Sequence, residues 1–299
     1  MKGSKGPRKR HGVFDKSSSE MLNPLDPFSR LIGRRTKELN VWQKIVLSRI
    51  PVDEKNIRLT LAYDGSQYHG WQRQDNGITI QEVVEEKLEI MFGAPIKLIA
   101  SGRTDAGVHA INQVCNFTTE SNIEPDAIKR GLNSLLPDDI HVNTTEYVPD
   151  EFHARYSAIS KIYEYGILNR TDPNVFLRHY LWHIRAPLDK GEIAKCLAIL
   201  MGNHDFSSFK SSGSSNTNAV RTISRAELYG PDEDGILRVI IEADGFLRHM
   251  VRNIVGTVVA VGLGKMSTDR FRAVLEAKDR QAAGIKAPAQ GLFLVSVRY

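Results

Sequence analysis

The stretch "NIRLTLAYDG" (residues 56–65) alternates apolar and polar side chains and then ends in Asp-Gly. This alternation predicts a half-buried β-strand, and Asp-Gly predicts a turn directly after it. The next patterned stretch, "TIQEVVEEKLEIMFG" (79–93), places its apolar residues at helical spacing. Thr79 and Glu82 form a capping box at its start, and Gly93 ends it. A strand, a turn and a helix therefore open the patterned part of the chain.

The elements that follow continue this order. Two more strands are predicted from "IKLIASG" (96–102) and "INQVCNFTT" (111–119), and Pro125 starts a second helix in "PDAIKRGLNSLLP" (125–137). Another strand follows in "DIHVNTTEYV" (139–148). This β-α-β-β-α-β order is the split βαβ pattern of ferredoxin-like domains, whose sheet is mainly antiparallel.

The second half of the chain is patterned in a similar way. Its predicted elements are a helix (189–202), a Ser-rich mobile loop (206–219), a hairpin (221–230 and 235–245), two helices (247–261 and 267–279) and a closing strand (291–299). We therefore predict an α+β protein with two ferredoxin-like or RRM-like half-domains, residues 55–158 and 159–299. Their mainly antiparallel sheets are expected to flank a central active-site cleft.

The composition is that of an ordinary globular protein: 299 residues, 41% hydrophobic and 25% charged. No apolar run approaches the length of a membrane span, and no signal-peptide hydrophobic region is present, so we expect no membrane partner. Cys115 and Cys196 lie far apart, which argues against a disulfide framework or a thiolate zinc site. We expect a cytoplasmic protein.

The positive charge is concentrated in residues 1–54, which hold 12 Lys and Arg against 6 Asp and Glu. The other 245 residues hold 28 against 29 and are almost neutral. We predict that residues 1–54 form a basic, disordered extension, which either contacts nucleic acid or is simply solvated. Within it, "VWQKIVLSRI" (41–50) fits a short amphipathic helix.

The stretch "SGRTDAGVHA" (101–110) places one carboxylate, Asp105, among small residues, with Arg103 two positions upstream. Small neighbours allow a positive φ angle or the close approach of a large ligand, and a nearby cation would hold the carboxylate ionised. On these ten residues alone, a tight turn that uses Asp and Gly for local hydrogen bonds is the favoured explanation. Their function has to be decided by the rest of the chain.

The helix "RHMVRNIVGTVVAV" (248–261) is apolar over most of its surface. Its polar residues fall on one stripe at helical spacing, namely His249, Arg252, Asn253 and Gly256. A buried guanidinium needs an anionic partner, so Arg252 is expected to pair with a carboxylate such as Asp105. A purely structural ion pair is the alternative interpretation.

Two stretches combine cations with aromatic rings, "FHARYSAISKIYEYGIL" (152–168) and "YDGSQYHGWQRQ" (63–74). This combination suits phosphates and unstacked bases, although an aromatic strand packed on a core would look the same. Strand alternation puts Lys161, Tyr163 and Tyr165 on one face. The chain shows no histidine pair or cluster with metal-ligand spacing, no Walker A loop and no G-x-S-x-G elbow, so no metal site is expected.

Taken together, "GRTDAGVHA", "FHARYSA", "HMVRNIVG" and "GLFLV", in this order and spacing, resemble the tRNA pseudouridine synthase A (TruA-type) family. The resemblance covers about residues 56–299. It implies a cofactor-free isomerase that converts uridine to pseudouridine at positions 38, 39 and 40 of the tRNA anticodon stem-loop. It also implies a homodimer whose two subunits both grip each tRNA.

The same resemblance implies roles for individual residues. Asp105 would be the catalytic aspartate, Arg252 its partner and Tyr163 the active-site tyrosine. Arg103 would assist base flipping, and Leu292 would pack beside the flipped base. Further RNA contacts are implied for Phe152, His153, Ala154, Arg155 and Tyr156. A single carboxylate nucleophile suits the chemistry, as in retaining glycosidases, whether it attacks C1′ or C6.

Two other functions use some of the same residues. A non-catalytic RNA-binding module would need the cations and aromatic rings, but it has no use for Asp105 facing a phosphate. A metal-dependent phosphohydrolase would use His and Asp residues, and activity that persists in excess EDTA would exclude it.

Deleting residues 1–54 is expected to weaken tRNA binding at low salt and to flatten the slope of log K against log salt. Basic arms bind phosphates by counterion release and do not read bases, so the set of modified uridines should stay the same. Binding measured at several salt concentrations tests this. An unchanged slope would show that the extension is merely solvated.

Overall fold

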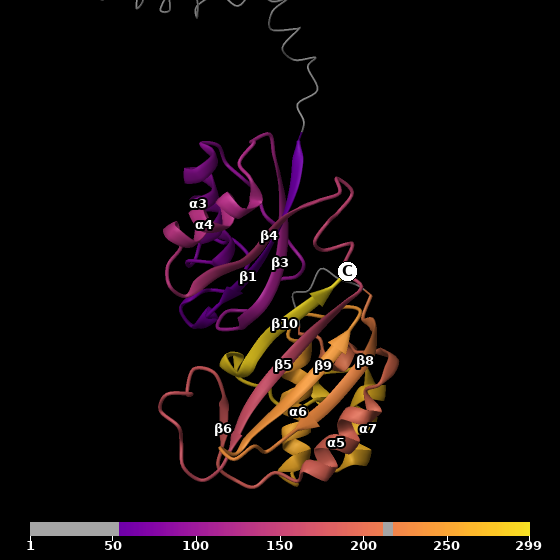
Figure 1. Ribbon diagram of the computed structural model, residues 1–299. Helices are drawn as coiled ribbons and strands as arrows, with labels where there is room; N and C mark the ends of the chain where they lie inside the picture. The colour runs from indigo at the N-terminus through magenta and orange to yellow at the C-terminus, as the bar shows by residue number, and fades with distance from the viewer. Residues whose placement is uncertain (1–53, 212–217) are drawn as a thin grey trace, which may run out of the picture. The chain divides into compact units, whose positions relative to one another are not determined.

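The computed structural model describes residues 54–211 and 218–299, shown as the coloured ribbon in Figure 1. The predicted extension 1–54, apart from its last residue, and the predicted helix at 41–50 lie outside the described residues. The first half of the described part contains β1 (Lys55–Tyr63), η1 (Gly65–Gln67), α3 (Ile80–Phe92), β2 (Ile99–Ala100), β3 (His109–Thr119), α4 (Pro125–Leu135) and β4 (Ile140–Val148). The predicted β-α-β-β-α-β order is confirmed.

Local sequence explains the first of these elements. Ile57, Leu59 and Leu61 of β1 are fully buried and alternate with more exposed residues, as the pattern predicts. The Thr79 side chain accepts a hydrogen bond from the backbone N–H of Glu82, which caps α3, and Gly93 ends the helix at a φ of 69°. The predicted strand at 96–102 is shorter than expected, because only Ile99 and Ala100 pair with β3.

The second half adds strands and helices in the predicted sequence, with two strands that the sequence did not suggest. Its elements are β5 (Ser160–Asn169), β6 (Trp182–Ile184), α5 (Lys190–Ile199), β7 (Gly202–Asp205), η2 (Ser207–Phe209), β8 (Val220–Tyr229), β9 (Ile236–Ala243), α6 (Met250–Gly262), α7 (Thr268–Ala277), η3 (Arg280–Ala282), η4 (Ala289–Gly291) and β10 (Leu292–Arg298). The hairpin β8–β9, the helix α7 and the closing strand are confirmed.

The Ser-rich stretch 206–219 is not a loop throughout. Phe206 and Phe209 are fully buried, and the ring of Phe209 packs 6.0 Å from that of Phe271 on α7. The two aromatic rings therefore anchor the first part of the stretch, although its serines suggested exposure. Residues 212–217 lie outside the described part of the chain.

All strands of the described residues belong to one mixed sheet, in the order β4-β1-β3-β10-β5-β9-β8-β7, with β2 beside β3 and β6 beside β5. The pairs are antiparallel except β10–β3 and β5–β6. The α+β class with a mainly antiparallel sheet is confirmed. The division into half-domains at residue 158 stays a prediction.

The last strand joins the two halves of the sheet. β10 lies between β3 and β5 (Figure 1), and it pairs Phe293 with His109 and Leu294 with Ala110 on one side. On its other side Leu294 lies opposite Tyr163 of β5. The loop that leads into β3 is therefore placed next to the residues of β5.

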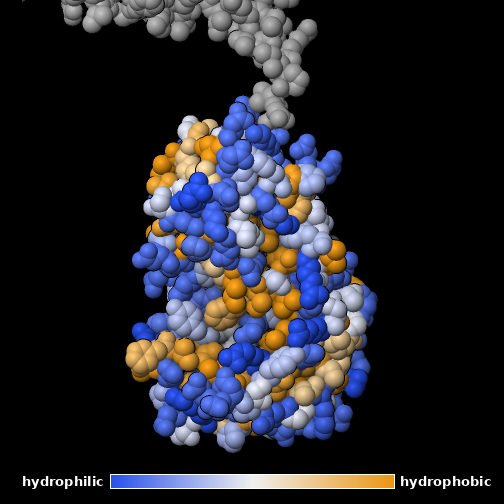
Figure 2. All heavy atoms as spheres, viewed as in Figure 1, coloured by the Kyte–Doolittle hydropathy of each residue, from blue (hydrophilic) through white to orange (hydrophobic). Residues whose placement is uncertain are grey.

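The helices cover the sheet in two groups. α3 packs against α4 in the first half, and α5, α6 and α7 pack against one another in the second. Figure 2 shows hydrophilic residues over most of the visible face of the described body, with hydrophobic residues gathered across its middle at the level of β10. An apolar band in an otherwise polar surface is typical of a binding face. Within the described residues, the structure has no helix with the length and apolar character of a membrane span.

A close helix crossing fixes the segment that precedes β10. Gly256 of α6 faces the carbonyl of Ile285, and a Cβ on Gly256 would lie 1.8 Å from that oxygen. The backbone bond from Ala287 N–H to the Arg252 carbonyl, 3.0 Å, depends on this approach. Only glycine therefore allows residues 284–287 to cross α6 so closely.

We expect Gly256→Ala to destabilise the protein by about 1–3 kcal/mol, because the new methyl group overlaps a backbone oxygen. The matched control is Gly131→Ala in α4, whose new Cβ would meet the end of the flexible Met91 side chain. Ala is favoured over Gly in a helix by about 1 kcal/mol, so the control should be neutral or stabilising. Urea unfolding measures both. Equal effects of the two substitutions would contradict the close crossing.

Candidate active site

The loop before β3 holds Asp105 in a fixed turn. The backbone N–H of Val108 donates to the Asp105 carbonyl at 3.1 Å, and Gly107 takes a φ of 76°. The carbonyl of Thr104 accepts from the N–H of Trp71 at 3.1 Å, and its hydroxyl lies 2.9 Å from that of Tyr63. The loop is therefore a tight turn, as one interpretation of the sequence had it, and it is supported from outside as well.

Two glycines of the 63–74 stretch make that support possible. A Cβ on Gly65 would lie 2.0 Å from the Val108 carbonyl oxygen, and one on Gly70 would lie 2.6 Å from that of Thr104. The N–H of Gly107 also donates to the Tyr68 carbonyl at 3.3 Å. The glycines of this stretch thus pack directly against the Asp105 loop, a role that sequence reasoning missed.

Arg252 is the ion-pair partner of Asp105. Its Nη1 donates to Asp105 Oδ2 at 2.9 Å, and its Nε donates to the Ala287 carbonyl at 2.9 Å. The residue is only 9% exposed, because α6 is apolar around most of its surface and is buried on nearly every side. The predicted pairing is confirmed by this geometry. The Asp105 side chain remains 26% exposed and can be reached from solvent.

His249 approaches the other oxygen of the same carboxylate. Its Nε2 lies 3.6 Å from Asp105 Oδ1, and the residue takes a φ of 60° just before α6. Burial lowers the pKa of this imidazole, and Lys286, Arg252 and Arg248 lower it further while Asp105 raises it. His249 is therefore mainly neutral at pH 7.

The helix predicted at 247–261 begins three residues later in the structure, at Met250. A turn closed by the N–H of Met250 and the Leu247 carbonyl, 3.0 Å, precedes it. In the sequence, His249 could be recognised as a candidate site residue because it falls on the polar stripe of this helix. Its left-handed backbone could not be read from the stripe, because a non-glycine residue seldom adopts a positive φ.

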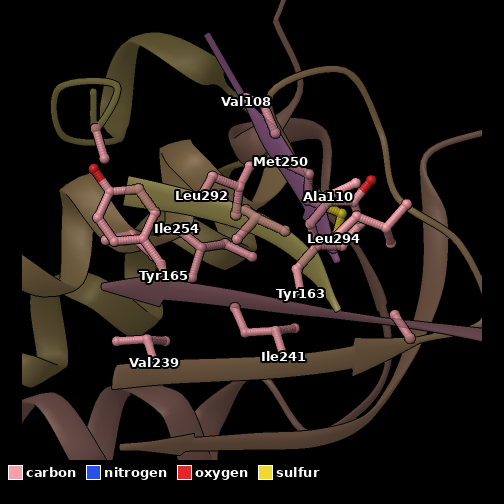
Figure 3. Close-up of a cluster of buried hydrophobic side chains, with 14 of the residues drawn as sticks. Val108, Ala110, Tyr163, Tyr165, Val239, Ile241, Met250, Ile254, Leu292 and Leu294 are labelled. Atoms are coloured by element: carbon pink, nitrogen blue, oxygen red, sulfur yellow. The ribbon is translucent and has the colours of Figure 1, made fainter. Parts of the chain in front are cut away.

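An apolar layer lies beside the ion pair. Tyr163 is 7% exposed, and its ring packs edge-to-face on Phe246 with the centroids 4.9 Å apart. Leu292, 5% exposed, starts β10 opposite Tyr165. Figure 3 shows both tyrosines and Leu292 in the layer between β10, β5 and α6. Lys161 shares their face of β5, as predicted, since it lies two residues before Tyr163.

Arg103 is exposed on the loop itself. It forms no hydrogen bond or ion pair with any residue that the structure describes. An unpaired exposed guanidinium beside a reachable carboxylate is free to contact an anionic ligand.

The five residues at 152–156 divide into two kinds. The backbone N–H of Ala154 donates to Asn116 at 2.9 Å, and the Phe152 ring packs 4.9 Å from that of Tyr299, so both belong to the packed fold. Tyr156 is 75% exposed, with the Arg155 guanidinium 5.5 Å from its ring centroid. The His153 ring packs at a tilt against Tyr156, with the ring centroids 4.3 Å apart. RNA contacts of all five stay predictions.

A shallow pocket adjoins the Asp105 loop. Its volume is about 430 Å³, and it is lined by Ser66, Gly107, Arg178, His179, Ala289 and Gln290. A reachable carboxylate held by a buried guanidinium, with free space next to its loop, can attack an electrophilic carbon of a ligand.

Comparison with known proteins extends this picture. The family model described as tRNA pseudouridine synthase matches residues 60–157 and 197–299. Asp105, Arg252 and Leu292 fall within these ranges, and Tyr163 falls between them.

Curated relatives that match most of this chain are named tRNA pseudouridine synthase A. A "tRNA pseudouridine synthase A" of Thermoanaerobacter sp. (strain X514) is 46% identical over 245 residues, which cover 82% of this chain and 100% of that protein. Its counterpart in Acetivibrio thermocellus is 44% identical with the same coverage of this chain. That of Exiguobacterium sibiricum is 45% identical, with 97% of its length covered. The chain belongs to the tRNA pseudouridine synthase family.

Proposed function

We propose that this chain converts uridine to pseudouridine at positions 38, 39 and 40 of the tRNA anticodon arm, with the Asp105 carboxylate as nucleophile. Family membership gives the reaction class, an isomerisation of uridine in tRNA. The observation that supports Asp105 most directly is its 2.9 Å ion pair with the buried Arg252, combined with its partial exposure. A purely structural ion pair does not require an oxygen open to solvent.

The reaction moves a bond without a net oxidation or reduction. The carboxylate attacks C1′ or C6 of the uridine, and the bond between N1 and C1′ breaks. The base rotates, C5 bonds to C1′, C5 loses its proton and N1 ends with a proton. The carboxylate leaves unchanged, so a single nucleophile is enough.

Arg252 is proposed to keep the carboxylate ionised once RNA displaces water from the site. Removing water strengthens the attraction between the two charges, and the Ala287 carbonyl holds the guanidinium in place. His249 approaches the second oxygen, so contacts at both oxygens restrict rotation of the carboxylate group. The nucleophile is thereby oriented before substrate arrives.

The target base has to leave its stack to reach Asp105. Flipping a base out of a stem costs a few kcal/mol, which the enzyme has to offset with its own contacts. Arg103 is proposed to fill the vacated space or to hold the extruded strand, and Tyr163 and Leu292 to contact the flipped base. Their packing on one apolar layer supports that assignment.

The protonation state of Tyr163 limits what it can do. Burial raises the pKa of its hydroxyl far above the ordinary value, and the nearby Tyr63 and Asp105 raise it further. The side chain is therefore a neutral phenol at pH 7, and a neutral phenol is a weak base. Stacking on the base is the role favoured by this environment, and acceptance of the C5 proton is the alternative.

We also propose a cytoplasmic homodimer whose subunits both contact each tRNA. The family resemblance supports the dimer, and the exposed Val175 and Phe176, at 60% and 82%, offer apolar contact area. Light scattering of the purified chain would measure its mass in solution.

Asp105→Asn should remove essentially all turnover, because it deletes the nucleophile at almost constant shape. The affinity for tRNA should stay within about threefold of wild type, since binding and chemistry are separated by this change. Pseudouridine formation and binding are measured on the same tRNA. The control is Asp138→Asn, which changes an exposed carboxylate in the turn before β4 and should behave as wild type.

Multiple turnover by an Asn variant shown by mass spectrometry to be free of deamidated protein would overturn the assignment of Asp105.

Tyr163→Phe and Tyr163→Leu separate the two roles of the tyrosine. If stacking dominates, Phe keeps activity and Leu loses it, because a stacked ring contributes about 1–3 kcal/mol per base. If the hydroxyl accepts the C5 proton, Phe itself stalls the reaction after the base has been attacked. Single-turnover rates measure both. Near-wild-type rates for both variants would remove Tyr163 from the site.

A further inference from the structure

Lys161 is a half-buried cation that the proposed reaction does not use. It lies on β5 opposite Ala243 of β9, on the same face as Tyr163. Its Nζ donates to the Ser101 carbonyl at 2.6 Å, and a Cβ on Gly102 would lie 3.2 Å from the same atom. The ammonium group therefore rests against the backbone that leads into the Asp105 loop.

Neither Lys161 nor the cations near it have a counter-charge in the described part of the chain. Arg155, from the segment before β5, and Arg221, from β8, both act on Lys161 as positive charges. None of the three forms an ion pair with a described residue, and the Arg221 guanidinium donates to the backbone carbonyls of Asn218 and Val220.

Arg221 lies two residues before Ile223 of β8, which pairs with the same Ala243 as Lys161. The Arg221 Nε would lie 3.3 Å from a Cβ on Gly245. Lys161 and Arg221 are therefore close neighbours across β9, and Arg155 adds a positive charge from the segment before β5.

The acids of the neighbouring strands are used elsewhere. Glu164 of β5 lies 3.5 Å from Arg238, and Glu242 of β9 lies 3.1 Å from Arg298. Both acids are an odd number of positions from the Lys161–Ala243 pair and therefore point to the opposite face of the sheet. On the loop, the carboxylate of Asp105 is already held by Arg252.

A half-buried ammonium without an ion-pair partner is costly. Burial lowers the pKa of Lys161 to about 8, and the charges of Arg155 and Arg221 act in the same direction. A neutral donor could make the single hydrogen bond to Ser101 without this cost. Cationic clusters retained in this way are typical of sites that receive an anion.

We propose that Lys161, Arg155 and Arg221 form a binding site for a phosphodiester group of the RNA backbone, beside the nucleotide that enters the Asp105 loop. The identification of the anion as RNA rests on the proposed function. Gly102 carries no side chain, so a phosphate can approach the ammonium closely along the loop. The site fixes the backbone while Asp105 acts on the base.

Phosphate binding also makes affinity depend on pH. The ammonium of the free protein loses its proton as pH rises through about 8, and a bound phosphate stabilises the protonated form. Binding therefore takes up a proton above that pH. Affinity for tRNA should weaken as pH rises above about 8, and Lys161→Met should remove this part of the dependence.

The test compares Lys161→Met with Lys265→Met, an exposed lysine beyond the far end of α6. Lys161→Met should weaken tRNA binding about tenfold and reduce the slope of log K against log salt by about 1, as expected for one lost phosphate contact. The larger kinetic effect should fall on KM and not on kcat. Lys265→Met should retain the wild-type slope, and Lys161→Arg should restore much of the slope lost in Lys161→Met.

A salt slope for Lys161→Met equal to that of Lys265→Met would overturn the phosphate site. A lower melting temperature and a lower kcat with an unchanged slope would assign Lys161 a structural role instead. Should Lys161→Met fail to fold, Arg221→Gln on β8 provides the same slope measurement away from the Asp105 loop.

Binding is measured without turnover. If wild type forms no pseudouridine in tRNA, the proposed function fails while the slope comparison still decides whether a polyanion binds here.

Discussion

The guanidinium of Arg252 has to be neutralised, and the site is built around that requirement. It is 9% exposed, and its partner Asp105 comes from a segment 147 residues earlier in the chain. Leaving the buried guanidinium without its carboxylate partner would cost several kcal/mol. The close crossing at Gly256 and the backing of the loop by Gly65 and Gly70 both keep the two side chains in register.

The strand β10 makes this meeting possible. Its parallel pairing with β3 involves only two residue pairs, Phe293 with His109 and Leu294 with Ala110. On its other side β10 pairs with β5 over most of its length. The Asp105 loop, which leads into β3, is thereby brought near the face of β5 that carries Tyr163 and Tyr165. The candidate site thus depends on contacts between segments far apart in sequence.

Sequence periodicity predicted the elements whose stability is mostly local. The capped helix α3, the hairpin β8–β9 and the buried helix α6 follow from spacing, capping residues and turn residues. Periodicity gave no information about β6 and β7, which are only three and four residues long, or about the positive φ of His249. It also could not show that Gly65 and Gly70 support the loop, because that role exists only in the folded chain. The pairing of Arg252 with Asp105 was predicted because a buried guanidinium needs a carboxylate partner, and the structure shows that pair. The RNA contacts at 152–156 stay predictions.

The central claim is that this chain isomerises uridines 38, 39 and 40 of tRNA. It is tested most directly by mapping pseudouridine at single-nucleotide resolution in tRNA from cells with and without the protein. The account predicts that pseudouridine disappears at these three positions and persists elsewhere. Retention at all three positions in cells that lack the protein, or loss only at other positions, would contradict it.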